Sequence, residues 1–173
     1  LVRLWEALPV NDAIQEGIAL RQLGQLAHRR GASDEAARRY AEALVIWRRL
    51  DHPWGIPSTL RDQAGVALDQ HNPTLYRESL VRWRDLGERL HMSDCLAGLA
   101  RAALQMGRHE LAAMLLGAEE ALNASMGYVP AQPVHADLAD PIATVLGQDD
   151  FEAIRAEGAA RSLESGIDEV LAV

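Results

Sequence analysis

Two similar stretches lie 36 positions apart in this chain of 173 residues. Residues 44–50 read LVIWRRL and residues 80–86 read LVRWRDL, and a tyrosine precedes each stretch by four positions, as Tyr40 and Tyr76. A fixed spacing of this length between similar stretches is typical of repeat architectures, in which each repeat is one supersecondary unit. We therefore expect a stack of helix pairs, with Trp47 and Trp83 packing between helices rather than forming a site.

The composition favours helices. Hydrophobic residues make up 49% of the chain but aromatic residues only 5%, so alanine and leucine must provide most of the packing. These two residues head the ranking of helix propensities. No alternation of apolar and polar residues is long enough to predict a strand. The predicted fold class is all-α, a stack of antiparallel helix pairs with a C-terminal cap of short helices.

The charge is uneven and argues against several classes of partner. The net charge is -8; residues 1–110 hold 15 Arg against 14 acidic residues, whereas residues 111–173 hold 2 Arg against 11. We expect no direct binding of nucleic acid, because the chain has no basic cluster. No apolar run reaches the ~18–20 residues that would span a membrane.

The single cysteine, Cys95, excludes an internal disulfide and fits a reducing compartment, so we expect a cytoplasmic location. The chain begins with Leu1 and has no signal peptide, which suggests a fragment of a longer protein.

Three helix pairs are predicted, over about residues 11–50, 57–90 and 93–126. In the first pair, Asn11-Asp12 and Ser33 are the expected N-caps and Gly31 the expected C-terminal stop. The second pair starts near Pro57, and its second helix opens at Asn72-Pro73. The third pair starts at Ser93-Asp94, breaks at Gly107 and ends before Gly127.

The two ends of the chain each leave two interpretations. Residues 1–10 are either the end of a preceding helix or a lead-in. Residues 128–173 are predicted to form a helical cap behind a loop rich in proline, over 128–133. The cap contains three short helices, over 140–146, 149–160 and 163–171. Alternatively, Pro141 lies as a kink inside a longer helix that starts near Val134.

The first helices of the pairs align with one another. Their shared positions are Leu20, Leu23, Gly24 and Ala27 in pair one, Leu60, Gln63, Ala64 and Ala67 in pair two, and Leu96, Leu99, Ala100 and Ala103 in pair three. The first two copies are 40 residues apart, whereas the second helices are 36 apart. One helical turn is therefore missing between Gln70 and Tyr76, which leaves the helix faces in register.

These positions resemble tetratricopeptide repeats. The resemblance implies a tetratricopeptide-like superhelix of antiparallel helix pairs, closed by the C-terminal cap of short helices. The segments LAGLA (96–100), AAMLLGAE (112–119), LG (146–147) and AEG (156–158), with Phe151, further resemble the C-terminal helical region of LuxR-, MalT- and AfsR-type bacterial transcriptional regulators and related signalling ATPases. The resemblance implies a nucleotide-binding domain before this region and a DNA-binding helix-turn-helix after it. Neither is in this sequence, which contains no GxxxxGK[ST] phosphate loop.

No pattern of reactive residues predicts an enzyme. The six histidines show no i, i+4 pair and no metal-ligand spacing, so we expect no metal, no cofactor and no catalytic residue. Cys95 follows an expected helix start, where a thiol can be activated, but no base is placed beside it and a buried structural thiol is the favoured interpretation.

The candidate binding surface is the polar side of the first helices, which lines the inner groove in tetratricopeptide stacks. The candidate site residues are Arg21, Gln25, His28, Arg29, Arg61, Asp69, Arg101 and Gln105; Gly65, Leu68 and Leu104 fall at equivalent positions. Guanidinium groups favour carboxylate or phosphate ligands. The alternative is that these arginines only solvate an exposed face.

The sequence thus predicts a non-catalytic scaffold that binds a protein segment or a small anionic effector in this groove, within a regulator. A module that only self-associates, as a homo-oligomer without a ligand, is the alternative.

Overall fold

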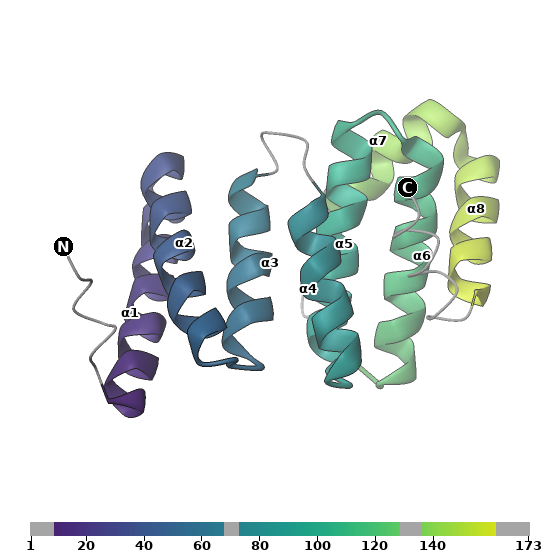
Figure 1. Ribbon diagram of the computed structural model, residues 1–173. Coiled ribbons are helices and arrows are strands. Elements are labelled where there is room, and N and C mark those ends of the chain that lie inside the picture. Colours follow the sequence, from purple (N-terminus) through teal and green to yellow (C-terminus); the bar gives the residue numbers. More distant parts are fainter. Residues whose placement is uncertain (1–8, 68–72, 129–135, 162–173) are drawn as a thin grey trace.

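The computed structural model describes residues 9–67, 73–128 and 136–161, and throughout these residues the regular structure is α-helical, as expected. The helices follow one another along the stack from α1 at one end to α8 at the other (Figure 1). They are α1 (Val10–Arg29), α2 (Ser33–Arg49), α3 (Gly55–Ala67), α4 (Thr74–Asp85), α5 (Arg89–Gln105), α6 (His109–Ser125), α7 (Ala136–Leu146) and α8 (Gln148–Ala160).

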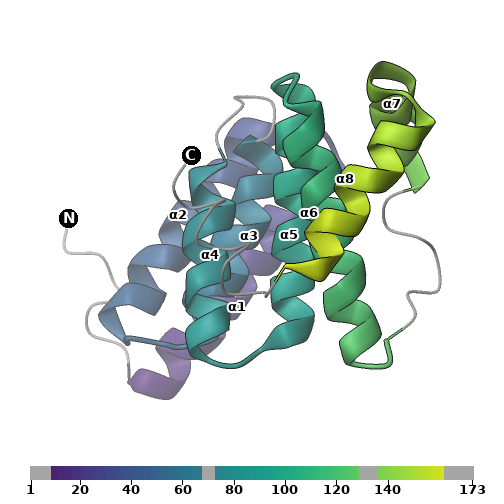
Figure 2. The same ribbon diagram turned by 90° about the vertical axis from the view of Figure 1, so that its right-hand side faces the viewer.

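Each helix packs against the next one in the chain. The odd-numbered helices also contact one another in order, α1 with α3, α3 with α5 and α5 with α7, and they therefore form a continuous row. At the C-terminal end α6 packs against both α7 and α8, and Figure 2 shows α8 lying across this end of the stack. Among the described helices, none is long and apolar enough to cross a bilayer.

Helix ends repeat one backbone motif. At the end of α1, Gly31 has a φ of +75°, its N–H donates to the His28 carbonyl at 2.9 Å, and the Ala32 N–H donates to the Ala27 carbonyl at 3.0 Å. This is the Schellman arrangement, which needs a residue in the left-handed region and therefore favours glycine. Gly107 and Gly127 also have positive φ values, so the stops predicted at these three glycines are confirmed.

The boundary between the second and third pairs differs from the prediction. The sequence predicts a helix to about Leu90 and a new start at Ser93, but α4 ends at Asp85 and α5 begins at Arg89. Gly87 causes the earlier break: its N–H donates to the Arg84 carbonyl, and the next N–H donates to the Trp83 carbonyl, both at 2.9 Å. Ser93 is consequently a buried residue inside α5.

The predicted N-caps are also wrong. Helix α1 begins at Val10 behind Pro9, so Asn11 and Asp12 lie within its first turn, and no side chain caps it. Helix α2 has Ala32 at its N-cap position, and Ser33 is its first residue. Ala32 closes the Schellman turn after α1 and is at the same time the N-cap residue of α2. Helix α2 therefore begins at the next residue, Ser33.

The second pair is shorter than the first. Helices α3 and α4 have 13 and 12 residues, against 20 and 17 for α1 and α2. The missing turn is predicted between Gln70 and Tyr76, and residues 70–72 of that stretch lie outside the described residues. In the cap, α7 runs through Pro141, which agrees with the interpretation of a longer helix containing this proline rather than one that starts beside it. The helix predicted over 163–171 also lies outside the described residues.

Large aromatic rings pack directly against glycines. Trp47 is 2% exposed, and its ring lies between Gly17 of α1 and Gly55 of α3; a Cβ on Gly17 would be only 2.7 Å from the ring. Tyr40 covers Gly24 in the same way, and Tyr76 covers Gly98. Since any larger residue would overlap these rings, the glycines set how closely the helices approach.

Trp47 and Trp83 are therefore core residues, as predicted. Trp83 is fully buried, and the Trp47 Nε1–H donates to Thr59 Oγ1 at 3.1 Å. The Thr59 hydroxyl in turn donates to the Gly55 carbonyl at 2.8 Å. The indole is thus fixed by both packing and a satisfied polar group.

The cap is held by a second kind of close approach. A Cβ on Gly117 of α6 would overlap the backbone of α8 at Arg155, and a Cβ on Gly158 of α8 would overlap the backbone of α6 at Met114. The two helices therefore meet backbone to backbone. Arg155 also bonds Glu120 of α6, at 3.0 Å, at the edge of this contact.

Two glycine-to-alanine variants should have opposite effects on stability. Gly24→Ala places its Cβ about 2.5 Å from Tyr40 Cε1, inside a buried ring, and should lower the free energy of unfolding by about 1–3 kcal/mol. Gly65→Ala meets its nearest atom only at 3.7 Å and gains helix propensity, so it should raise stability by roughly 0.5 kcal/mol. Urea denaturation followed by circular dichroism measures both, and equal effects would contradict the packing described.

Candidate functional site

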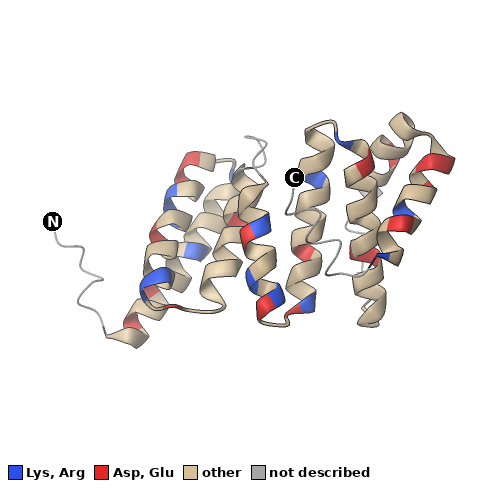
Figure 3. Ribbon diagram, turned by 45° about the vertical axis from the view of Figure 1, so that its right-hand side comes forward, with Lys and Arg blue, Asp and Glu red and all other residues tan. Residues whose placement is uncertain are grey.

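The arginines predicted to line the groove form ion pairs along the row of odd-numbered helices. Arg21 Nε of α1 lies 2.7 Å from Asp62 Oδ2 of α3, and Arg101 of α5 lies 2.7 Å from Asp137 Oδ2 of α7. Between them, Arg61 of α3 bonds Asp94 of α5. In each pair the arginine reaches the next odd-numbered helix, and basic and acidic residues intermingle over the stack (Figure 3). We call these six residues the Arg–Asp ladder.

Asp62 is the centre of this network. Its Oδ2 accepts from Arg21 Nε and from Gln25 Nε2, both at 2.7 Å, and Arg61 approaches its Oδ1 at 3.4 Å. The Asp62 side chain is only 11% exposed, so its bonds are sheltered from water. Hydrogen bonds to a charged group contribute about 1.5–3 kcal/mol each in such surroundings, whereas an exposed pair contributes about 1 kcal/mol or less.

The ladder changes how two of the candidate residues are understood. Arg21 and Arg61 do not project freely into a groove, because acidic side chains of α3 and α5 hold both of them. Arg61 also lies 3.4 Å from His91 Nδ1, on the helix that carries Asp94. Part of their role is consequently to cross-link neighbouring helices.

A solvent-open cavity of about 410 Å³ lies beside the ladder, between α1, α3 and α5. We call it the central cavity; its lining residues are Gln25, His28, Arg29, Tyr40, Arg61, Asp62, Gly65, Tyr76 and Asp94. Four of the eight candidate residues are among them, namely Gln25, His28, Arg29 and Arg61. The structure thus brings together half of the set chosen from periodicity.

The other four candidates are elsewhere. Arg21 joins the cavity only through its bond to Asp62, and Arg101 faces Asp137 further along the row. Gln105 is the exposed last residue of α5. Asp69 lies outside the described residues, as does Leu68 at the position beside it.

Tyr40 and Tyr76 line the central cavity, although the sequence predicted only a packing role for them. The rings of Tyr40 and Tyr76 are buried on glycines, yet neither hydroxyl has a hydrogen-bond partner among the described residues. A Cβ on Gly65, in the cavity lining, would lie 3.7 Å from the Tyr76 hydroxyl and 4.0 Å from His28 Nε2. Their repeated position, four before each LV-x-W stretch, was the signal in the sequence.

Both phenols are neutral near pH 7. Burial, and to a lesser extent the Asp62 carboxylate, raises the pKa of Tyr40 to about 12. Burial also raises the pKa of Tyr76 to about 12. Each hydroxyl can therefore donate a hydrogen bond into the cavity.

The charges around the cavity are nearly balanced. Asp62 and Asp94 offset Arg21 and Arg61 through the ladder. Arg29 is exposed and has no ion pair within the part of the chain that the structure describes. It adds one positive charge at the mouth of the cavity.

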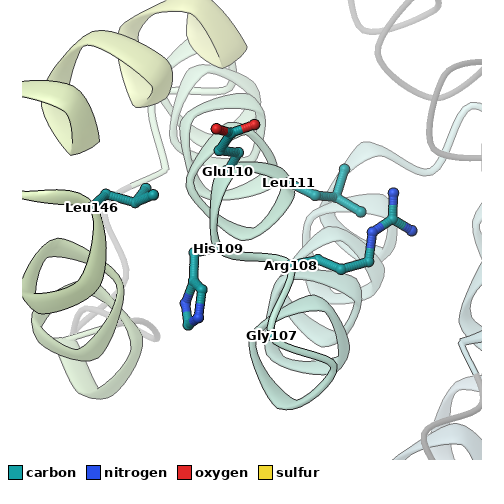
Figure 4. Close-up of a pocket in the computed structure, with 6 residues that line it drawn as sticks. All are labelled: Gly107, Arg108, His109, Glu110, Leu111 and Leu146. Carbon is teal, nitrogen blue, oxygen red and sulfur yellow. The ribbon is translucent and has the colours of Figure 1, made fainter.

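A second cavity, of about 360 Å³, lies where α6 begins (Figure 4). The His109 ring lies on the side of Leu146, and its Nδ1 is buried without a hydrogen-bond partner. Arg108 points to the other side of the helix start. Glu110 also lines this cavity but is directed away from the His109 ring, so the unpaired ring nitrogen is not joined by a second group for catalysis or metal binding (Figure 4).

Cys95 shows no sign of reactivity. Its thiol is buried between α4 and α5 and donates to Ser79 Oγ at 3.4 Å. Burial raises the pKa of this thiol to about 12, which disfavours the nucleophilic thiolate. Within the described ranges, no three His, Cys, Asp or Glu side chains are grouped so that they could hold a metal ion.

Comparison with known proteins adds no family. The sequence matches no protein-family model, and no curated protein or solved structure is significantly similar to it.

Removing the charge of Asp62 should destabilise the fold more than removing an exposed charge. Asp62→Asn weakens the acceptor for Arg21 and Gln25 and should cost about 1–3 kcal/mol in free energy of unfolding. Glu35→Gln, whose partner Arg39 lies 3.6 Å away at the surface, should cost less than about 0.5 kcal/mol. Chemical denaturation at low salt compares the two, and an Asp62 variant as stable as the wild type would show that the ladder contributes nothing.

Proposed function

We propose that this chain is a non-catalytic helical-repeat scaffold whose row of odd-numbered helices binds a segment of a partner protein. The observation that carries the proposal is the central cavity, which exposes polar groups from three successive odd-numbered helices on one side of the stack. A bound segment that follows the row would meet one set of these groups per helix. Repeat proteins use extended surfaces of this kind for binding.

The row also supports the tetratricopeptide-like arrangement. Contacts of α1 with α3, α3 with α5 and α5 with α7 are those expected when first helices of successive pairs line one inner face. The offset of 36 residues between the two LV-x-W stretches agrees with it. We therefore propose that the helix pairs form a tetratricopeptide-like superhelix.

The proposed setting is a bacterial transcriptional regulator of the LuxR, MalT or AfsR type, acting in the cytoplasm. Its support is the resemblance of residues 96–100, 112–119 and 146–158 to the helical region of such regulators. Binding in the central cavity would then be relayed to other domains. The sequence of the complete protein decides this part: a phosphate loop before the region or a helix-turn-helix after it is the expected result.

Selection from a peptide library tests the scaffold. Random peptides displayed on phage should be enriched by the immobilised chain, and their affinities can be measured by calorimetry. Gly65→Leu fills the cavity from its lining and should weaken the selected peptides by at least about tenfold, since it excludes them from the polar groups.

The matched control is Ala41→Leu, which adds the same side chain on an exposed position of α2. It should leave the affinities unchanged. Peptides that bind both leucine variants as tightly as the wild type would place binding elsewhere, and a lack of any enriched peptide would count against the scaffold.

Self-association is the second candidate function, and one surface feature favours it. Three of the exposed apolar side chains lie at two helix turns: Trp54 is 44% exposed in the turn before α3, and Leu86 and Leu90 are 38% and 45% exposed around the turn before α5. Trp54 lies near Trp83 and His91, with ring centroids 5.3 and 5.8 Å apart, so the two turns are neighbours. We propose that Trp54, Leu86 and Leu90 belong to one apolar patch.

Replacing this patch separates the two candidates. If the chain is a dimer through these turns, sedimentation velocity should show a concentration-dependent dimer that Leu86→Ser with Leu90→Ser converts to monomer. Gly65→Leu should not change that equilibrium. A monomer at all concentrations in the wild type would remove self-association as a function of this chain.

A further inference from the structure

The hydrogen-bonding groups of the central cavity are mostly donors. The hydroxyls of Tyr40 and Tyr76 and the exposed guanidinium of Arg29 have no hydrogen-bond partner among the described residues, and the same holds for the His28 ring. They come from three different helices, α1, α2 and α4, and all line the cavity that Gly65 of α3 also lines. Of these groups, the Tyr76 hydroxyl and His28 Nε2 lie nearest to Gly65, 3.7 and 4.0 Å from where its Cβ would be. The lack of a side chain at Gly65 leaves the space between them open.

The more buried carboxylate of the cavity, that of Asp62, is already occupied. Asp62 Oδ2 accepts from both Arg21 and Gln25, and its Oδ1 faces Arg61. Asp94 is held by Arg61. A ligand that brings hydrogen-bond donors would therefore compete with existing bonds, whereas a ligand that brings acceptors would complete the unpaired donors.

The charge balance limits the ligand further. Three arginines, at positions 21, 29 and 61, face two aspartates, at 62 and 94, so one positive charge is in excess. A monoanion neutralises this excess. A dianion would add one negative charge next to Asp62 and Asp94, which is unfavourable at short range.

We propose that the central cavity is a binding subsite for a single carboxylate, with Arg29 as its charged partner and with His28 and the hydroxyls of Tyr40 and Tyr76 as further donors. The inference rests on the proposed function, because it specifies which chemical group of a ligand the cavity receives. The carboxylate would connect α1 and α2 to α4 across the short helix α3. Its source is either an acidic side chain or the C-terminus of a bound segment.

Nuclear magnetic resonance titrations with small probes test the subsite in the complete chain. At constant ionic strength, sodium acetate should shift the Arg29 Nε–Hε and Gly65 amide signals in a saturable way, with a Kd on the order of 10 mM. Acetamide, which has the same shape without the charge, should produce no saturable shift. Inorganic phosphate should bind more weakly than acetate.

Conservative variants test the individual donors. Tyr76→Phe and Tyr40→Phe each remove one hydroxyl and keep the ring that packs on glycine, so each should weaken acetate binding by about threefold to tenfold. Arg29→Gln should weaken it by about tenfold or more. Arg30→Gln, on the adjacent exposed position outside the cavity, is the control and should have no effect.

Two peptides, each with a single carboxylate, identify its source: one is amidated and carries a central glutamate, and the other has a free C-terminus and no acidic side chain. Tighter binding of an amidated alanine peptide with one central glutamate supports a side chain, and tighter binding of an alanine peptide with a free C-terminus supports a chain end. Equal shifts with acetate and acetamide, tighter binding of phosphate, or acetate binding that Gly65→Leu leaves unchanged would each overturn the proposal.

The subsite and the scaffold can fail separately. Library peptides that bind in the cavity while acetate does not would disprove the carboxylate subsite and leave the scaffold. Acetate binding with the expected response of the variants, in the absence of any selected peptide, would support the subsite and count against the scaffold.

Discussion

The packing of aromatic rings on glycines is the contact on which this stack depends. Trp47 is held between glycines of α1 and α3, so one indole links the first helix pair to the second. Burial of such a ring stabilises the fold by about 2–3 kcal/mol, and the absence of a Cβ lets the helix axes come close. Tyr40 and Tyr76 repeat the device within α1–α2 and α4–α5. Because both rings are fixed in this way, their hydroxyls arrive at one place, the central cavity.

The apolar core is divided, and the cavity lies at the division. One cluster of buried residues joins α1, α2 and the first part of α3, and the largest cluster extends from Ala64 through α4 to α8. A small third cluster, of Ala27, Ala36, Tyr40 and Val66, lies apart from both. Leu75 packs against the first two clusters. At this point polar bonds around Asp62 and Arg61 also join the odd-numbered helices. A ligand in the cavity would therefore act where the two parts of the core meet.

The sequence predicted the helical class, the buried tryptophans and the glycine stops because each follows from local pattern. It did not predict the break at Gly87, since Leu86 and Leu90 continue an apolar helical pattern on both sides of it. The ion-pair partners of the arginines could not be predicted from the sequence either. Arg21 and Arg61 occupy equivalent positions, but their aspartates lie 41 and 33 residues further on and hence at different places in the repeat.

The tyrosine hydroxyls show a further limit of sequence reasoning. Position within a repeat predicts that a ring is buried, but the direction of its hydroxyl depends on the contact with Gly24 or Gly98 from another helix. Leu23 shows the same limit: it shares the apolar side of α1 with Ala27 by periodicity, yet it is 48% exposed because no described helix covers that edge.

The Arg–Asp ladder has a direction. In every pair the guanidinium belongs to the earlier helix and the carboxylate to the later one. Cutting the row at any point would thus leave a positive group on the N-terminal piece and a negative group on the C-terminal piece. The row is therefore electrically polar along its length, because α3 and α5 each present a carboxylate to the preceding odd-numbered helix and a guanidinium to the following one.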